Sequence, residues 1–241
     1  MNLEQIILGL PAIRSGPNAS ERASPSVAWL FVSLKNRKFT RAYIDWFIDF
    51  CGSETRAGVI CLVDSPYRFN KMAELSVDQL SLEDEKKHSQ ISTEMTRKVN
   101  KALNGKDNPS IRFQNWGELE AETPEEMKAE VLSAFQSRGS FYATITSHVA
   151  IMKNCDDREM IDRLSCFFLA ELPVLFYAYY RGDQIIDVYP GEQPAFFRQF
   201  EEGMFGDELP VCTKFIKEGS PFIYLQTFDK KKMIASIFHT I

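Results

Sequence analysis

Ser33 is the first residue whose type and position could support chemistry. It follows an apolar run at residues 27–32 that is rich in β-branched and aromatic side chains, as is typical of a buried strand. Open α/β sheets bind their ligands beyond the carboxyl ends of such strands. Ser33 is therefore a candidate nucleophile, although a serine in this position more often caps the turn that follows the strand.

The chain offers little to activate such a serine. Its three histidines, His88, His148 and His239, lie far apart in the sequence, so a serine paired with a nearby histidine is not indicated. A nucleophilic Ser33 would need a substrate that is already reactive. The aminoacyl ester of a charged tRNA meets this requirement, because a modest base or a substrate amine could accept the proton.

Glu171 is the second unusual position, because every other residue in the run 167–176 is apolar. A buried carboxylate is costly unless a cation or several donors meet it. The α-ammonium group of an aminoacyl substrate is a suitable partner. Two structural alternatives stay open: Glu171 could bond backbone donors freed near Pro173, or it could pair with an internal Lys or Arg.

A basic helix face is the third candidate. Residues 82–103 contain neither Pro nor Gly and predict a long helix that stops at Asn104 and Gly105. At about 100° per residue, one face of this helix is polar and the adjoining face is apolar. The polar face carries Lys87, Gln90, Glu94, Arg97, Lys98 and Lys101, and the apolar face carries Ile91, Met95, Val99, Ala102 and Leu103. Such a face either contacts phosphate groups or is ordinary solvated surface.

Alternating strands and helices would position these residues. Predicted strands cover residues 27–32, 58–63, 111–113, 184–190, 222–225 and 234–238. Predicted helices cover residues 43–50, 82–103, 124–135, 158–181 and 194–202. This order predicts an α/β fold with a mostly parallel central sheet and helices on both faces. We expect residues 1–26 to be a flexible segment and residues 27–241 to form a single domain.

Composition excludes several classes of protein. The 241 residues carry a net charge of -5, so any contact with nucleic acid must come from a local basic patch. Five dispersed cysteines without C-x-x-C spacing indicate a reducing compartment and no structural zinc. We expect a soluble cytoplasmic protein, since neither a signal peptide nor a membrane span is evident. The common nucleotide-binding, zinc-protease and serine-hydrolase motifs are all missing from the sequence.

Three segments in this order resemble the cyclodipeptide synthases. They are Ser33-x-x-Asn36 after the first strand, residues 167–173 around the glutamate, and Tyr189-Pro190 after a later strand. That family is similar to the catalytic domain of class I tyrosyl-tRNA synthetases, but it consumes aminoacyl-tRNAs that are already charged. The resemblance extends over most of residues 27–206. It implies a Rossmann-like catalytic domain that needs no cofactor, neither ATP nor metal.

The resemblance also implies a role for each matched residue. Ser33 would accept the first aminoacyl group as an ester, and Glu171 would hold its α-ammonium group. A second aminoacyl-tRNA would give a dipeptidyl-enzyme, which cyclises to a diketopiperazine with Tyr189 assisting proton transfer. The implied substrate-binding residues are Asn36, Asp64, Phe167 and Pro190. The implied tRNA-binding residues are Lys87, Arg97, Lys98 and Lys101.

The sequence departs from the family pattern at two places. Phe167 stands where the family usually has a tyrosine, so a hydroxyl near the substrate is missing. Asn36 is typical of one branch of the family, whereas Tyr189-Pro190 is typical of the other and inclines the assignment toward that second branch.

Three functions follow from these observations. The leading one is a tRNA-dependent cyclodipeptide synthase that uses two aminoacyl-tRNAs, acts without a membrane, and is a monomer or homodimer. The second is another aminoacyl-tRNA-dependent transferase that passes the amino acid to a different amine. The third is a non-catalytic α/β module that binds tRNA or a small ligand.

Overall fold

A computed structural model gives the structure of the chain. It describes residues 12–13, 27–34, 38–55, 57–106, 110–181, 185–189, 196–218 and 223–226. The predicted flexible segment at residues 1–26 therefore lies outside the described residues except for Ala12 and Ile13. The predicted strand at residues 234–238 also lies outside them.

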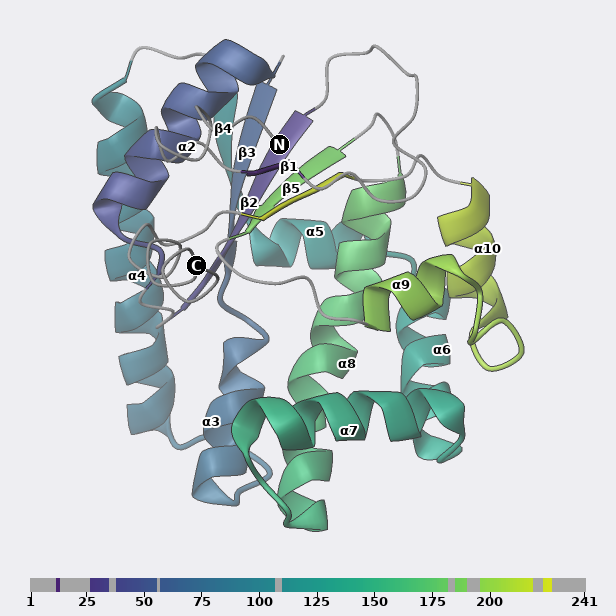
Figure 1. Cartoon of the computed structure of the whole chain (residues 1–241). Helices are drawn as coiled ribbons and strands as arrows, with labels where there is room; N and C mark the ends of the chain where they lie inside the picture. Colours follow the sequence, from purple (N-terminus) through teal and green to yellow (C-terminus); the bar gives the residue numbers. More distant parts are fainter. Residues whose placement is uncertain are drawn as a thin grey trace, which may run out of the picture.

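A six-stranded sheet in the order β1-β6-β5-β2-β3-β4 forms the centre of the molecule (Figure 1). Its strands are β1 (Ala12–Ile13), β2 (Val27–Ser33), β3 (Ala57–Val63), β4 (Ile111–Asn115), β5 (Ile185–Tyr189) and β6 (Ile223–Gln226). All neighbouring strands are parallel except the edge pair β1 and β6. The prediction of a mostly parallel sheet is confirmed.

Helices cover both faces of this sheet. They are α2 (Arg41–Glu54), α3 (Tyr67–Leu75), α4 (Leu82–Asn104), α5 (Trp116–Glu122), α6 (Glu125–Gln136), α7 (Ser140–Lys153), α8 (Arg158–Tyr180), α9 (Phe196–Glu201) and α10 (Pro210–Glu218). Figure 1 shows α2 and α4 on one face, and α5, α8 and α9 on the other. No helix in the described part of the chain is both long and apolar enough to cross a membrane.

Alternation along the strands explains these two layers. Trp29 and Phe31 of β2 belong to the core shared with α8, whereas Leu30 and Val32 belong to the core shared with α2 and α4. Successive residues of a strand point to opposite faces, so Ser33 has the same orientation as Trp29 and Phe31. The fold therefore directs Ser33 toward the face covered by α8.

The helix α8 is the central support of that second layer. Its N-cap is Asp157, whose Oδ1 accepts a hydrogen bond from the backbone N–H of Met160 at 3.1 Å. The helix packs against α3, α6, α7 and α10. Because so many elements contact α8, its position relative to the sheet is well defined.

Candidate active site

Ser33 lies at the carboxyl end of β2, where its Cα pairs with Val63 of β3. The residue is half-buried. Among the residues that the structure describes, the Ser33 hydroxyl has no hydrogen-bond partner. The alternative role as a turn cap stays untested, because residues 35–37 lie outside the described residues.

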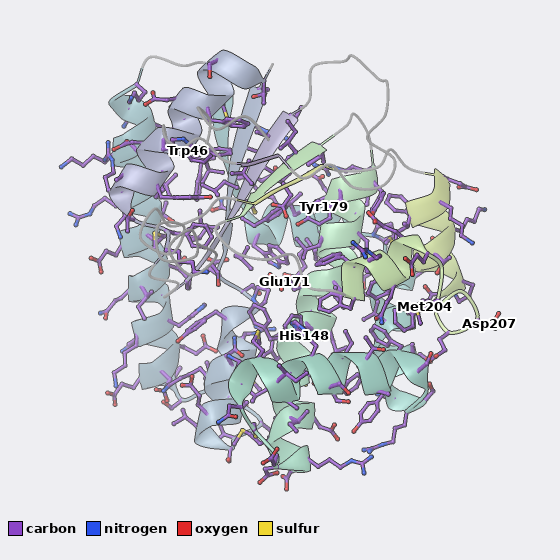
Figure 2. All side chains as sticks on the ribbon, viewed as in Figure 1. Trp46, His148, Glu171, Tyr179, Met204 and Asp207 are labelled. Atoms are coloured by element: carbon purple, nitrogen blue, oxygen red, sulfur yellow. The ribbon has the colours of Figure 1, made fainter. Side chains whose placement is uncertain are left out.

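Glu171 lies halfway along α8, and Figure 2 shows it on the side of this helix that faces the sheet. Within the described part of the chain, no donor or cation meets its carboxylate, so neither structural alternative for Glu171 is supported. Loss of hydration raises the pKa of Glu171 to about 8, and the nearby Asp187 carboxyl adds to this increase. An uncompensated carboxyl group of this kind is ready to receive a cation.

Asp187 is a second carboxyl at this site, more deeply buried than Glu171, and sequence reasoning missed it. It lies in β5 with only 5% of its surface exposed, and its Oδ2 accepts a hydrogen bond from the Tyr179 hydroxyl at 2.9 Å. Its Oδ1 is buried without a partner. Desolvation raises the pKa of Asp187 to about 7, against the opposing effect of the Tyr179 hydrogen bond. A lone acidic residue inside the apolar run 185–188 was the available sequence signal.

Strand register places Asp187 and Ser33 on the same face of the sheet. Asp187 pairs with Trp29 of β2, and Ser33 follows Trp29 with the same orientation. At a rise of about 3.3 Å per residue, the Ser33 level lies roughly 13 Å further along the strand. The site is therefore elongated, with a hydroxyl at its outer end and a carboxyl at its inner end.

Asp64 directly follows β3, next to the end of β2, but its carboxylate is already engaged. Its Oδ2 accepts a hydrogen bond from the Ser92 hydroxyl at 2.7 Å, and its Oδ1 accepts one from the Ser65 backbone N–H at 2.8 Å. The ring of His88 also lies 3.0 Å from the Asp64 carbonyl oxygen. These contacts join β3 to α4, and a substrate contact by Asp64 stays a prediction.

The remaining predicted substrate-binding residues are only partly visible. Phe167 is half-buried one turn before Glu171, with its ring edge-on to Phe168 at a centroid distance of 5.5 Å. Tyr189 ends β5, but its side chain lies outside the described residues, as do Asn36 and Pro190. Their predicted contacts with substrate stay untested.

The basic face of α4 has the predicted amphipathic arrangement. Val99 and Ala102 are buried against the sheet. The polar residues Lys87, Gln90, Glu94, Arg97, Lys98 and Lys101 are all exposed. Lys87 pairs with Glu83 at 2.6 Å, whereas no ion pair in the described part of the chain engages Arg97, Lys98 or Lys101. These last three cations are available to an anionic partner.

Among the comparisons with known proteins, only the comparison of structures finds matches. No family model and no curated protein matches the sequence. A cyclodipeptide synthase from Bacillus thermoamylovorans matches the structure with a TM-score of 0.63 at 15% identity, covering 85% of this chain and 90% of that chain. The chain has the cyclodipeptide synthase fold.

Further solved structures agree on the cyclodipeptide synthase fold. One from Candidatus Glomeribacter gigasporarum, bound to Phe-tRNAPhe, has a TM-score of 0.58 at 14% identity and covers 93% of this chain and 92% of that chain. A Mycobacterium tuberculosis protein has a TM-score of 0.59 at 15% identity, covering 83% of this chain and 84% of that chain. That structure relates cyclodipeptide synthetases to type I tRNA synthetases, in agreement with the Rossmann-like fold predicted here.

The cyclodipeptide synthase fold gathers groups suited to acyl transfer on one face. The Ser33 hydroxyl lies at the outer edge, and the unpaired Glu171 carboxyl approaches from α8. No group of three or more His, Cys, Asp or Glu side chains in the described part of the chain is arranged to hold a metal ion. This face therefore carries a hydroxyl at its outer edge and two carboxyl groups further in.

Proposed function

We propose that the chain is a tRNA-dependent cyclodipeptide synthase that joins two aminoacyl groups into a diketopiperazine. The observation that carries the proposal is the unpartnered Glu171 carboxyl in α8, on the same face of the sheet as the Ser33 hydroxyl. The cyclodipeptide synthase fold and the Phe-tRNAPhe bound to one structural neighbour support it. The enzyme would act in the cytoplasm, where its two aminoacyl-tRNA substrates are made.

The reaction begins with acyl transfer to Ser33. Its Oγ attacks the ester carbonyl of the first aminoacyl-tRNA, and the terminal ribose hydroxyl of the tRNA leaves with the proton. Glu171 holds the α-ammonium group of the bound aminoacyl residue and so fixes its position. Because its pKa is raised to about 8, Glu171 can also accept a proton from that group and release a nucleophilic amine.

Two further attacks complete the product. The amine on the Ser33 ester attacks the ester of the second aminoacyl-tRNA, which gives a dipeptidyl-enzyme and a second free tRNA. The new terminal amine then attacks the Ser33 ester, closes the six-membered ring and returns the hydroxyl to Ser33. Tyr189, at the end of β5, would assist the proton transfers.

Product identity tests this proposal. Purified full-length chain is incubated with tRNA charged with labelled amino acids, and mass spectrometry identifies the products. A diketopiperazine, with label that stays on the protein after acid precipitation, is the expected result. Linear transfer to another amine would indicate a different aminoacyltransferase, and tRNA binding without retained label or product would indicate a binding module.

The exposed cations of α4 should contribute to tRNA use. Replacing Arg97, Lys98 and Lys101 by Ala should raise KM for aminoacyl-tRNA and lower the slope of log KM against log salt by up to about 2 to 3, because fewer phosphate contacts release counterions. The matched control replaces Lys128, Lys214 and Lys217, which lie on α6 and α10, and should change neither quantity. Equal effects in both triple variants would show that the α4 cations act only through the overall charge of the protein and not as a tRNA-binding surface.

A further inference from the structure

The inner end of the site holds two carboxyl groups, Glu171 and Asp187, one more than a single α-ammonium group can pair with. Glu171 and Asp187 are close enough for the Asp187 carboxyl to affect the ionisation of Glu171. No hydrogen bond joins the two carboxyls, and among the described residues no Lys, Arg or His pairs with either of them. A substrate with a single ammonium group would leave the second carboxyl without a cationic partner.

Asp187 has a free acceptor at this place. Its Oδ2 is fixed by the Tyr179 hydroxyl, whereas its Oδ1 is buried and unbonded. The orientation of the carboxyl group is therefore set in advance, with one oxygen left to bind a donor. Buried polar atoms without partners are uncommon in native proteins and call for an explanation such as a bound ligand.

The surroundings of Asp187 suit an organic cation. Tyr179 makes edge-to-face contact with Phe31 at a centroid distance of 5.6 Å, and its ring also lies 6.1 Å from that of Phe197. All three rings are almost fully buried. Aromatic faces attract ammonium and guanidinium groups, most strongly where water is excluded.

We propose that Asp187, together with Glu171, selects an amino acid with a cationic side chain as one of the two building blocks. This inference rests on the proposed function and names its substrate class. The α-ammonium group occupies Glu171, and the guanidinium or ammonium group of the side chain binds the free Oδ1 of Asp187. A neutral side chain would leave that oxygen without a partner. It would be disfavoured because a buried polar group without a partner costs free energy.

Competition among charged tRNAs tests the selection. Full-length chain receives an equal mixture of tRNAs charged with Arg, Lys, Leu and Phe, and mass spectrometry quantifies every cyclic dipeptide. Products that contain Arg or Lys should exceed wholly neutral products at least about 10-fold. The mass of each product distinguishes Arg from Lys. A predominance of neutral products overturns the inference and leaves the proposed function intact.

Asp187→Asn identifies the residue responsible. The amide keeps the shape and can still accept from Tyr179, but it removes the charge, so the ratio of cationic to neutral products should fall at least about 10-fold, toward one. Asp162→Asn is the matched control on α8, where Asp162 instead accepts from the Tyr142 hydroxyl at 2.6 Å, and it should keep the wild-type ratio. An unchanged ratio in Asp187→Asn would remove Asp187 from substrate selection.

Binding of small amides separates this inference from catalysis. Argininamide and lysinamide each carry an α-ammonium group and a cationic side chain but no carboxylate. They should raise Tm more than leucinamide does at equal concentration. The difference should disappear in Asp187→Asn. A chain that forms no cyclic dipeptide but shows this preference would refute the proposed function alone. Equal effects of the three amides on the wild-type chain would contradict the cation site.

Discussion

Ser33→Ala should abolish cyclic dipeptide formation and the acid-stable aminoacyl-enzyme together. The substitution removes the only atom that we assign to the covalent intermediate, and loss of a nucleophile typically lowers kcat by at least about 10³-fold. Product is measured by mass spectrometry, and the intermediate is measured as labelled amino acid retained on acid-precipitated protein. Persistence of label at the wild-type level would exclude Ser33 as the acceptor.

The same variant should fold normally. Ser33 is half-buried and its hydroxyl bonds to none of the described residues, so its removal should change the free energy of unfolding by no more than about 0.5 kcal/mol. Ser133→Ala, on the exposed side of α6, is the matched control and should retain full activity. Product loss without a shift in Tm would separate chemistry from stability. A fall in Tm that parallels the product loss would instead indicate that Ser33 is structural.

The strands of the sheet could be predicted from sequence because each buried strand has a distinctive local composition. Residues 27–32 and 58–63 are continuous apolar runs, as expected for strands covered on both faces, and the structure contains β2 and β3 there. The helix α4 was equally predictable, since its apolar and polar faces separate cleanly and Ser81 caps its start.

The helix α7 was not predicted, for the opposite reason. Its sequence contains several β-branched residues, among them Thr144, Ile145 and Val149, which have low helix propensity. Tertiary contacts overrule this preference, because α7 packs on α6 and α8 and buries Phe141 against the rings of Phe200 and Phe205. A pattern within one segment cannot reveal partners that lie about 60 residues further along the chain.

The residues of the candidate site also differ in how far the sequence alone could reveal them. Ser33 and Glu171 stand out because each contrasts with its immediate neighbours in the sequence. The importance of Asp187 depends on its register with Trp29, on the Tyr179 hydroxyl and on the approach of Glu171, three contacts between separate elements. Only the structure shows that one of its oxygens is left unbonded.

Glu171→Gln should reduce product formation by about 100-fold or more while making the free protein more stable at pH 8. The activity falls because the amide cannot hold or deprotonate the α-ammonium group, an interaction of buried charges. The stability rises because the wild-type fold buries a carboxyl that resists ionisation. Its pKa lies near 4.5 in the unfolded chain and at about 8 in the folded one, so the native state binds the proton more tightly.

The sign of the pH dependence follows from this difference. The contribution of Glu171 is fully present below its unfolded pKa and is lost as the pH rises toward about 8. Each pKa unit corresponds to about 1.4 kcal/mol, so the loss amounts to a few kcal/mol in the absence of substrate. Denaturant unfolding of the wild type and of Glu171→Gln between pH 5 and pH 8 should therefore give curves that diverge as the pH rises.

Glu130→Gln supplies the control that separates a functional carboxylate from a structural one. The Glu130 carboxylate accepts hydrogen bonds from the backbone N–H groups of Val211 and Cys212, at 2.7 and 2.8 Å, where α10 begins. Its replacement should therefore destabilise the fold at pH 8 by roughly 1 to 2 kcal/mol and leave product formation unchanged. If Glu171→Gln destabilised the protein as Glu130→Gln does, its carboxylate would have a structural partner and the case for an ammonium-binding site would fail. Opposite effects of the two substitutions on stability, with activity lost only in Glu171→Gln, would show that a substrate cation is what Glu171 lacks in the free protein.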